Sequence, residues 1–251
     1  GKPCIMAYPD NLTDSPTDRA IADFFTFRPG QPDYVDGPTR NDQWGWLEVY
    51  PQHGYVKSPD GDFEQVAVGI AQNTSPDRKG HCGAFNVKDA YGRNFSVRNG
   101  FDPRVDGYLY GWNFDEQWER AYELDPELVF VTGWNEWTAG QMTRRHEDYD
   151  EEMRQWDFFP GANCGKGGRK IEMGESYFID QYNQEYSRDI EPMKGGHGDN
   201  YYYQLMAAVR RYKGVAEPVA AGPERTIDLN GGFDQWKQVD PKAPDLAEIR
   251  A

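Results

Sequence analysis

Short apolar segments, each followed by polar or turn-forming residues, dominate the hydrophobic pattern of this chain. Five of them have the length of a strand, and four are rich in β-branched or aromatic side chains, which strands favour. They comprise residues 4–7, 24–27, 44–50, 66–71 and 128–131. We therefore expect five strands, separated by helices and by long polar loops.

Three further segments carry helical patterns. Residues 15–23 fit a short helix, and between residues 114 and 124 the apolar side chains recur at the spacing of one helix face. The third helix is expected over residues 200–212, with Asp199 as its N-cap and Gly214 at its end. Helices that connect successive strands indicate an α/β fold.

Polar side chains collect at the ends of the predicted strands. Those that follow a strand are Asp10, Arg28, Gln72, Asn73, Asn135 and Glu136. A (β/α)8 barrel of the TIM type shows this asymmetry, because its site is built from the carboxyl ends of its strands. Five strands are fewer than a closed barrel needs. We therefore expect this chain to be the C-terminal part of such a barrel, with the N-terminal strands missing.

A change in composition marks a domain boundary near residue 215. Residues 215–225 form a linker rich in Pro and Ala, and a new pattern begins at Thr226. We assign residues 1–214 to the barrel-like catalytic domain and residues 226–251 to the start of a second module. Because so short a segment cannot fold alone, we expect the chain to be cut short at both ends.

The composition narrows the classes of function. Lys and Arg number 27 against 42 Asp and Glu, so the net charge is −15. Nucleic acids and anionic membranes attract clustered cations, so neither is an expected partner. The apolar segments are too short to span a bilayer. The 8 Trp, 16 Tyr and 13 Phe instead suggest a polar protein with an aromatic-lined cleft.

The cysteines and histidines predict no metal site and no cofactor. The 3 cysteines form no CxxC pair, and the 4 histidines show neither HxH nor HExxH spacing. Two states of Cys4, Cys82 and Cys164 are compatible with the sequence, namely one disulfide with a leftover thiol and three free thiols.

Residues 130–141, FVTGWNEWTAGQ, carry the most informative chemistry. A strand delivers Glu136 to its carboxyl end between Trp134 and Trp137, with Asn135 beside it. Cleavage of a glycosidic bond needs such a carboxylate at the anomeric centre. The Trp faces would stack on sugar rings, and Asn135 would bind a hydroxyl. The alternative is structural, with both Trp rings in the core and Glu136 paired with an arginine.

Glu48 is the candidate for the second catalytic carboxylate. Strict alternation along residues 44–50 puts four side chains on one face of a strand: Trp44, Trp46, Glu48 and Tyr50. If Glu48 and Glu136 act as a pair, a separation of about 5–5.5 Å indicates retention of configuration and about 6.5–9.5 Å indicates inversion. The alternative is an ion pair of Glu48 with Arg28 or Arg40.

Further polar side chains complete the predicted substrate contacts. These contacts are Arg28, Gln72, Asn73, Asp180, Glu191 and His197. The glycines around His197 indicate a tight turn. The imidazole of His197 either binds a sugar hydroxyl, relays a proton, or caps the following helix.

These residues resemble a known group of enzymes. Residues 130–140, the later Ile190-Glu191-Pro192 and the Tyr-rich helix from Tyr201 are similar to the C-terminal part of a glycoside hydrolase barrel. The group contains family 99 endo-α-mannosidases and family 71 α-1,3-glucanases. Its last strand reads N-E-W-x-E-G, and an L/I-E-P motif precedes its last barrel helix. The resemblance implies a (β/α)8 fold and a glycan substrate.

One position departs from the pattern of that group. The second glutamate of the motif, three positions after Glu136, is Ala139 in this chain. In the group this second glutamate resembles the general acid, and the first glutamate assists through the 2-hydroxyl of the sugar. Either Glu48, Glu191 or Asp180 therefore replaces the missing acid, or the protein only binds glycan.

The tail of the chain resembles the opening of a carbohydrate-binding module. In residues 226–236, TIDLNGGFDQW, the residues that fit the opening I-D-G-x-x-D-x-W of family 9-like β-sandwiches are Asp228, Gly231 or Gly232, Asp234 and Trp236. This resemblance implies that residues 226–251 begin such a β-sandwich, and it points to carbohydrate as the barrel motif does.

Together these features predict a glycoside hydrolase that cleaves a polysaccharide or complex glycan by carboxylate acid/base catalysis. The resemblance implies an extracellular, periplasmic or cell-surface location of bacterial type. The expected partners are a carbohydrate substrate and the rest of the same polypeptide. The alternative from another class is a non-catalytic glycan-binding or polysaccharide-assembly protein on a degenerate barrel. A carbohydrate lyase or deacetylase is the third alternative.

Overall fold

The structure is a computed structural model of the chain. It describes residues 1–32, 34–72, 92–136, 141–143, 174, 176–178, 184–185, 187–215, 228, 230–232 and 234–235. The chain divides into two compact units, Gly1–Ala208 and Val209–Ala251. Every strand that the described residues form lies in the first unit.

A helix between two parallel strands forms the N-terminal part. Strand β1 (Cys4–Ile5) pairs with β2 (Thr26–Phe27), and helix α1 (Pro16–Phe24) connects them after a 3-10 turn, η1 (Pro9–Asn11). The hydroxyl of Ser15 caps α1 by accepting the N–H of Asp18 at 3.1 Å. The predicted helix is therefore confirmed. The predicted strand over residues 24–27 is shorter than expected, because Phe24 still belongs to α1.

The central sheet contains three strands in the order β3–β4–β7. Strand β3 (Tyr55–Lys57) runs antiparallel to β4 (Phe63–Gly69), and β4 runs parallel to β7 (Leu128–Thr132). The predicted strands over residues 66–71 and 128–131 are thereby confirmed, with β4 beginning earlier than expected. Residues Val66 to Ala71 are fully buried, as expected for an inner strand that is covered on both faces.

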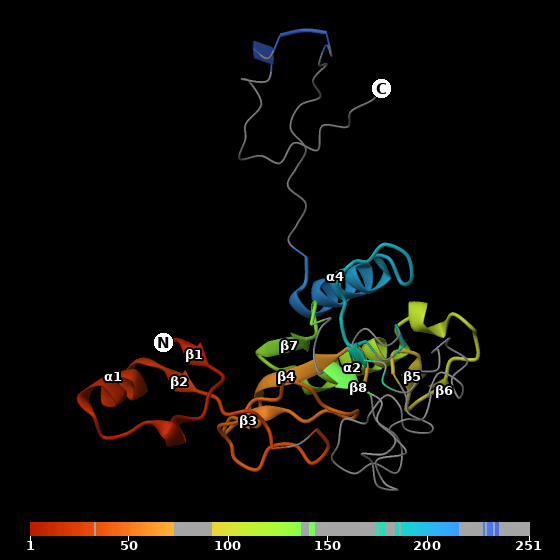
Figure 1. Cartoon of the computed structure of the whole chain (residues 1–251). Coiled ribbons are helices and arrows are strands. Elements are labelled where there is room, and N and C mark those ends of the chain that lie inside the picture. The colour runs from red at the N-terminus through yellow and green to blue at the C-terminus, as the bar shows by residue number, and fades with distance from the viewer. Residues whose placement is uncertain are drawn as a thin grey trace, which may run out of the picture. The chain divides into compact units, whose positions relative to one another are not determined.

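Helix α2 (Trp112–Leu124) covers this sheet, as Figure 1 shows for α2 over β4. Its apolar face buries Phe114, Trp118 and Ala121, in agreement with the predicted helix. Gly111 precedes the helix with a φ of 63°. This positive φ favours glycine, whereas the end of the Gln204 side chain, 2.2 Å from a Cβ placed there, could move aside.

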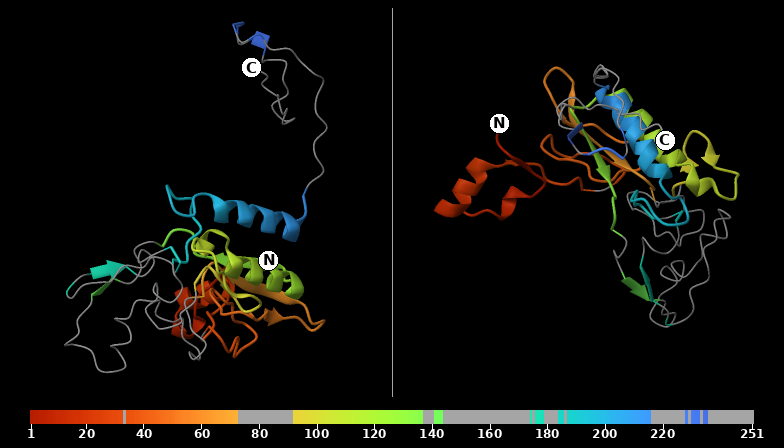
Figure 2. Two further views of the ribbon diagram at one scale, coloured as in Figure 1. Left: turned by 90° about the vertical axis from the view of Figure 1, so that its right-hand side faces the viewer. Right: turned by 90° about the horizontal axis from the view of Figure 1, so that it is seen from above.

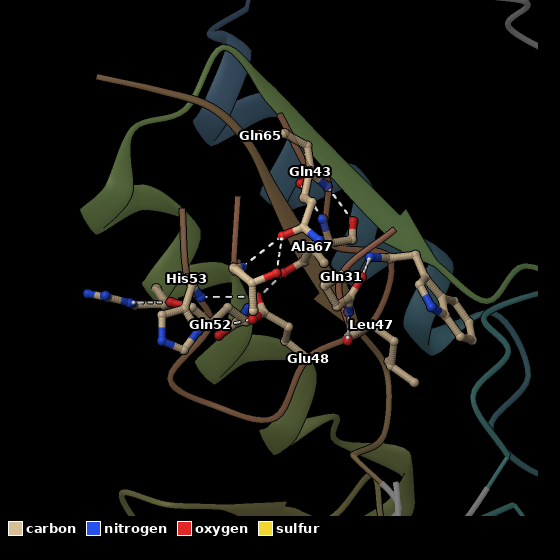
Figure 3. A network of polar contacts seen from close by, with 12 residues as sticks. Gln31, Gln43, Leu47, Glu48, Gln52, His53, Gln65 and Ala67 are labelled. Atoms are coloured by element: carbon tan, nitrogen blue, oxygen red, sulfur yellow. Dashed lines mark hydrogen bonds and ion pairs between the residues drawn. The ribbon is translucent and has the colours of Figure 1, made fainter. Parts of the chain in front are cut away.

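The segment 44–50 is not the strand that alternation predicts. Only Trp44 makes a bridge, parallel to Gly30, and the rest is irregular. Side-chain amides occupy the backbone groups that a neighbouring strand would bind (Figure 3). Gln65 bonds to both the N–H and the C=O of Gly45, at 3.0 and 2.7 Å. The alternation of faces therefore fails, and Glu48 is buried while Trp46 is half-buried.

Other glutamines complete this replacement. Gln31 accepts the N–H of Trp46 at 2.8 Å and donates to the C=O of Leu47. Gln117 of α2 accepts the N–H of Gly69 at 2.6 Å and donates to the C=O of Glu48 at 2.8 Å. Gln52 donates to the carbonyls of Ala67 and Gln117 at 3.0 and 3.1 Å. Buried backbone groups are thus satisfied without a strand ladder.

Figures 1 and 2 also show the remaining elements of the described part. They are β5 (Phe95–Ser96), β6 (Gly100–Phe101), η2 (Gly107–Leu109), β8 (Gln141–Thr143), β9 (Ser176–Phe178) and α4 (Asn200–Lys213). Helix α4 confirms the third predicted helix within one residue. No helix of the described part is both long and apolar enough to cross a membrane.

The sheets in the described part remain separate, and none closes into a barrel. The structure therefore shows a mixed helix and strand fold, and the complete barrel stays a prediction. Most of residues 226–251, predicted to begin a β-sandwich, lie outside the described residues. The described ones include a turn in which the side chain of Gln235 bonds to the backbone of Asp228 at 2.9 and 2.8 Å.

Candidate functional site

Strand β7 carries the Trp-Asn-Glu sequence to its carboxyl end. Thr132 is the last residue of the strand, Gly133 follows with a φ of 88°, and Trp134, Asn135 and Glu136 are all exposed. The N–H of Glu136 donates to Oδ1 of Asp189 at 2.7 Å. Glu136 is therefore not buried, and among the described residues no arginine forms an ion pair with it.

A second segment lies directly beside this strand end. The N–H of Ile190 donates to the C=O of Gly133 at 3.2 Å, and the N–H of Glu191 donates to the C=O of Trp134 at 2.9 Å. The Ile190-Glu191-Pro192 motif therefore lies next to the Trp-Asn-Glu motif, although more than 50 residues separate Glu136 from Asp189. Glu191 itself is half-buried.

Gly133 makes the close approach of these two segments possible, which gives a first prediction. A Cβ at this position would lie 1.9 Å from the carbonyl oxygen of Arg188, and the positive φ adds strain for any other residue. We expect Gly133→Ala to lower the free energy of unfolding by about 2 kcal/mol or more, as measured by urea denaturation.

Gly100→Ala is the matched control for Gly133→Ala. Gly100 has a similar φ of 72°, but a Cβ there would have no atom within 4 Å. This variant therefore reports the backbone strain without the collision. Equal destabilisation by both variants would show that the contact with Arg188 contributes nothing.

Arg93 holds the second segment from the inside of the protein. Its fully buried guanidinium donates from Nε to the C=O of Ser187 at 2.8 Å, and from Nη2 to Oγ of Ser187 at 3.1 Å and to the C=O of Asp189. It also lies over the ring of Tyr201, 4.5 Å from the centroid. A chain of contacts thus leads from Arg93 through Asp189 to Glu136.

The surroundings of Arg93 are electrostatically unusual. Burial lowers the pKa of the guanidinium, while the nearby Tyr201, Asp189 and Glu185 favour its charged form. Burial likewise raises the pKa of Tyr201, whose hydroxyl donates to the C=O of Tyr108 at 2.5 Å. Glu185 accepts the N–H of Asn94 at 3.1 Å. The cluster is therefore a buried polar support for the strand end.

His197 belongs to this support rather than to the surface. It is buried, its ring meets the ring of Tyr201 edge-on at 5.0 Å, and its Nδ1 lies 3.1 Å from the C=O of Gly198. The predicted contact with a sugar hydroxyl is thus not available to His197 in this structure. Burial, and then the charge of Arg93, lower the pKa of His197 to about 4.

The depressed pKa of His197 predicts a pH dependence of stability. Between pH 6.5, the ordinary pKa, and about 4 the unfolded chain binds a proton at His197 that the folded chain does not. Stability should therefore fall as the pH decreases through this window, with a contribution of at most about 1.4 kcal/mol per pH unit. We expect His197→Gln to show a shallower pH dependence in urea denaturation. Identical pH profiles for both proteins would contradict the prediction.

Glu48 is bound by His53, and neither of the arginines predicted as its partner binds it. Its carboxylate accepts the N–H of His53 at 3.0 Å and lies 3.0 Å from Nδ1 of the same ring. The alternative partners Arg28 and Arg40 bind other acids, Glu64 and Asp42. Glu48 is thus buried and held by His53 within the irregular segment 44–53.

Glu64 joins two of the predicted site residues. Arg28 donates to both its carboxylate oxygens at 2.7 and 2.6 Å, and Nε1 of Trp44 donates to Oε1 at 2.7 Å. The bidentate hydrogen bonds from Arg28 hold the pKa of Glu64 below its usual range. Arg28 and Trp44 are thus brought together by a residue that the sequence analysis missed.

The other predicted site residues are distributed as follows. Trp46 is half-buried against Tyr34, 5.7 Å between ring centroids, and Tyr50 is half-buried. Gln72 is buried just beyond the end of β4. Trp137, Asn73 and Asp180 lie outside the described residues.

Within the described part no three side chains of His, Cys, Asp or Glu gather to hold a metal ion, and Cys4 is a free thiol.

Arg93 and Asp189 are the supporting residues that sequence reasoning did not find. Asp189 directly precedes the Ile190-Glu191-Pro192 motif, which was the one available signal. Nothing in the sequence distinguishes Arg93 from the exposed Arg98. The chain shows no significant match to any family model, curated protein or solved structure.

Proposed function

We propose that the protein is a glycoside hydrolase that acts on a polysaccharide or complex glycan, with Glu136 as a catalytic carboxylate. The observation that carries this proposal is the exposed Glu136 beside the exposed Trp134 at the carboxyl end of β7. The backbone of Glu136 is held by Asp189, whose Oδ1 accepts the N–H of Glu136 at 2.7 Å. A fixed carboxylate next to an indole ring suits a sugar whose anomeric carbon reacts.

Glu191 is a better second carboxylate than Glu48. The backbone N–H of Glu191 bonds to Trp134 at 2.9 Å, which places this residue beside the strand end that carries Glu136. Glu48 is buried and bound by His53. Glu191 therefore takes the place of the glutamate that Ala139 replaces in the motif, and it acts as proton donor to the leaving oxygen.

The arrangement of the parallel segments supports a (β/α)8 barrel as the fold. In chain order β1 lies beside β2, Gly30 beside Trp44, and β4 beside β7, all parallel. Trp44 also bonds to Glu64 of β4. Apolar side chains are exposed at both ends of this series: Ile5, Met6, Leu128 and Phe130. In a barrel the rest of the same polypeptide covers these side chains. The resemblance alone supports the extracellular, periplasmic or cell-surface location that we propose.

The test is an assay of the purified chain on a panel of polysaccharides that includes galactomannan, mixed-linkage glucan, α-1,3-glucan and polygalacturonate. New reducing ends are the result we expect. Binding without new reducing ends would favour the non-catalytic glycan-binding protein, for which Ala139 is the specific observation. Unsaturated products or released acetate would instead indicate a lyase or a deacetylase.

A further inference from the structure

Three aromatic rings are exposed next to each other beside Glu136. Trp134 is 45% exposed, Tyr202 is 39% exposed and Tyr203 is 62% exposed. The centroids of Trp134 and Tyr202 are 6.3 Å apart, and those of Tyr202 and Tyr203 are 6.1 Å apart. The rings are inclined to one another by 74° and 62°, and they lie in a row from the carboxyl end of β7 to the first turn of α4.

Three successive tyrosines in the first turn of α4 differ in burial: Tyr201 points into the protein, and Tyr202 and Tyr203 lie at its surface. Tyr201 is completely buried against Arg93 and His197. Its neighbours Tyr202 and Tyr203 lie at the surface, with 39% and 62% of their area exposed. Adjacent exposed aromatic rings of this kind are more often found at binding surfaces than elsewhere on a protein.

We propose that Trp134, Tyr202 and Tyr203 form a binding platform for a saccharide chain that extends outward from Glu136. This inference rests on the proposed function and deepens it, since Trp134 is shared with the catalytic strand end. The apolar C–H faces of successive sugar rings contact the exposed faces of the aromatic rings, while the hydroxyl groups stay in water.

The charges of the protein favour a neutral saccharide. The chain has a net charge of −15, and an anionic glycan would need a compensating patch of cations. Arg28, Arg40 and Arg104 are paired with Glu64, Asp42 and Asp102 at 2.6, 2.5 and 2.5 Å. Arg93 is buried. These arginines therefore supply no such patch, and we expect uronic and sulfated glycans to bind poorly.

Affinity electrophoresis in native gels that contain galactomannan, mixed-linkage glucan or polygalacturonate tests the platform. We expect at least one neutral polysaccharide to retard the protein, and polygalacturonate to retard it less. Tyr203→Ala should raise the dissociation constant about 3- to 10-fold, the range of one lost aromatic contact. Tyr203→Phe keeps the ring and should bind as the wild type does.

Phe24→Ala is the control for a lost exposed ring, because Phe24 is 58% exposed on α1 and has no part in the platform. Wild-type affinity of Tyr202→Ala and Tyr203→Ala, or no retardation of the wild type by any neutral polysaccharide, would overturn the platform. Stronger retardation by polygalacturonate would overturn the neutral ligand. Retardation that depends on Tyr203 without any new reducing ends would support the platform and refute the hydrolase, so the two failures are distinguishable.

Discussion

Replacement of Glu136 by Gln should lower kcat for glycan hydrolysis by about 10²- to 10⁴-fold and leave the affinity for the saccharide within about threefold. The amide keeps the size and shape of the side chain, but it can neither carry negative charge nor exchange a proton near neutral pH. Because the side chain of Glu136 is exposed and Asp189 bonds to its backbone rather than to its carboxylate, the fold should not change.

Glu127→Gln is a matched control for Glu136→Gln. Glu127 is an exposed glutamate next to the opposite, amino end of β7, and its backbone N–H bonds to Phe63 at 3.0 Å. The two variants have the same change in charge at the two ends of one strand. Steady-state kinetics should show a large loss of kcat only for Glu136→Gln. Equal rates in both variants would exclude Glu136 as a catalytic residue.

Three helices were predictable because their signals are local. Ser15 caps α1 through Asp18, three residues away, and the apolar side of α2 repeats along a single helix. Strands β4 and β7 were also predictable, since short apolar runs rich in β-branched or aromatic residues favour strands, although only β4 is buried and β7 exposes Leu128 and Phe130. Glu136 was found for the same reason, as the polar residue just beyond such a run.

The failure at residues 44–50 has a long-range cause. Alternation predicts a strand only if another strand binds its backbone, and here Gln31, Gln65 and Gln117 bind it instead. The local pattern does not predict hydrogen bonds with glutamines that lie up to 69 residues away in the sequence. The contact of Glu48 with His53 could not be predicted once a strand was assumed, because a strand would separate these two side chains.

The support beneath the site was unpredictable for a similar reason. Arg93 reaches the backbone of residues 187 and 189 across more than 90 residues of sequence, and the buried ring of Tyr201 lies between two exposed tyrosines. An arginine in a polar stretch is ordinarily a surface residue. Its burial depends on acceptors that only the folded chain brings together, so composition and spacing cannot reveal it.

Arg93→Met should lower the free energy of unfolding by about 3 kcal/mol or more. Methionine is of similar length, and it relieves the desolvation of a charge that burial already disfavours. It leaves the C=O of Ser187 and the C=O of Asp189 without the guanidinium as donor, while the Oγ of Ser187 keeps the N–H of Asp189 at 3.4 Å. Each buried polar group that loses its partner costs about 1–3 kcal/mol, so we expect the two losses together to exceed the relief.

Arg98→Met and Arg93→Lys make the interpretation of Arg93→Met specific. Arg98 is exposed, and its replacement should change stability by less than about 0.5 kcal/mol. Lysine at position 93 keeps the charge, but it lacks the planar guanidinium that donates to Ser187 and Asp189 simultaneously. We therefore expect the free energy of unfolding of Arg93→Lys to lie between those of the wild type and Arg93→Met. Urea denaturation of the three variants measures this order. Equal stability of Arg93→Met and the wild type would mean that the segment beside Glu136 is positioned by its backbone contacts with Gly133 and Trp134, and that Asp189 needs no anchor from within.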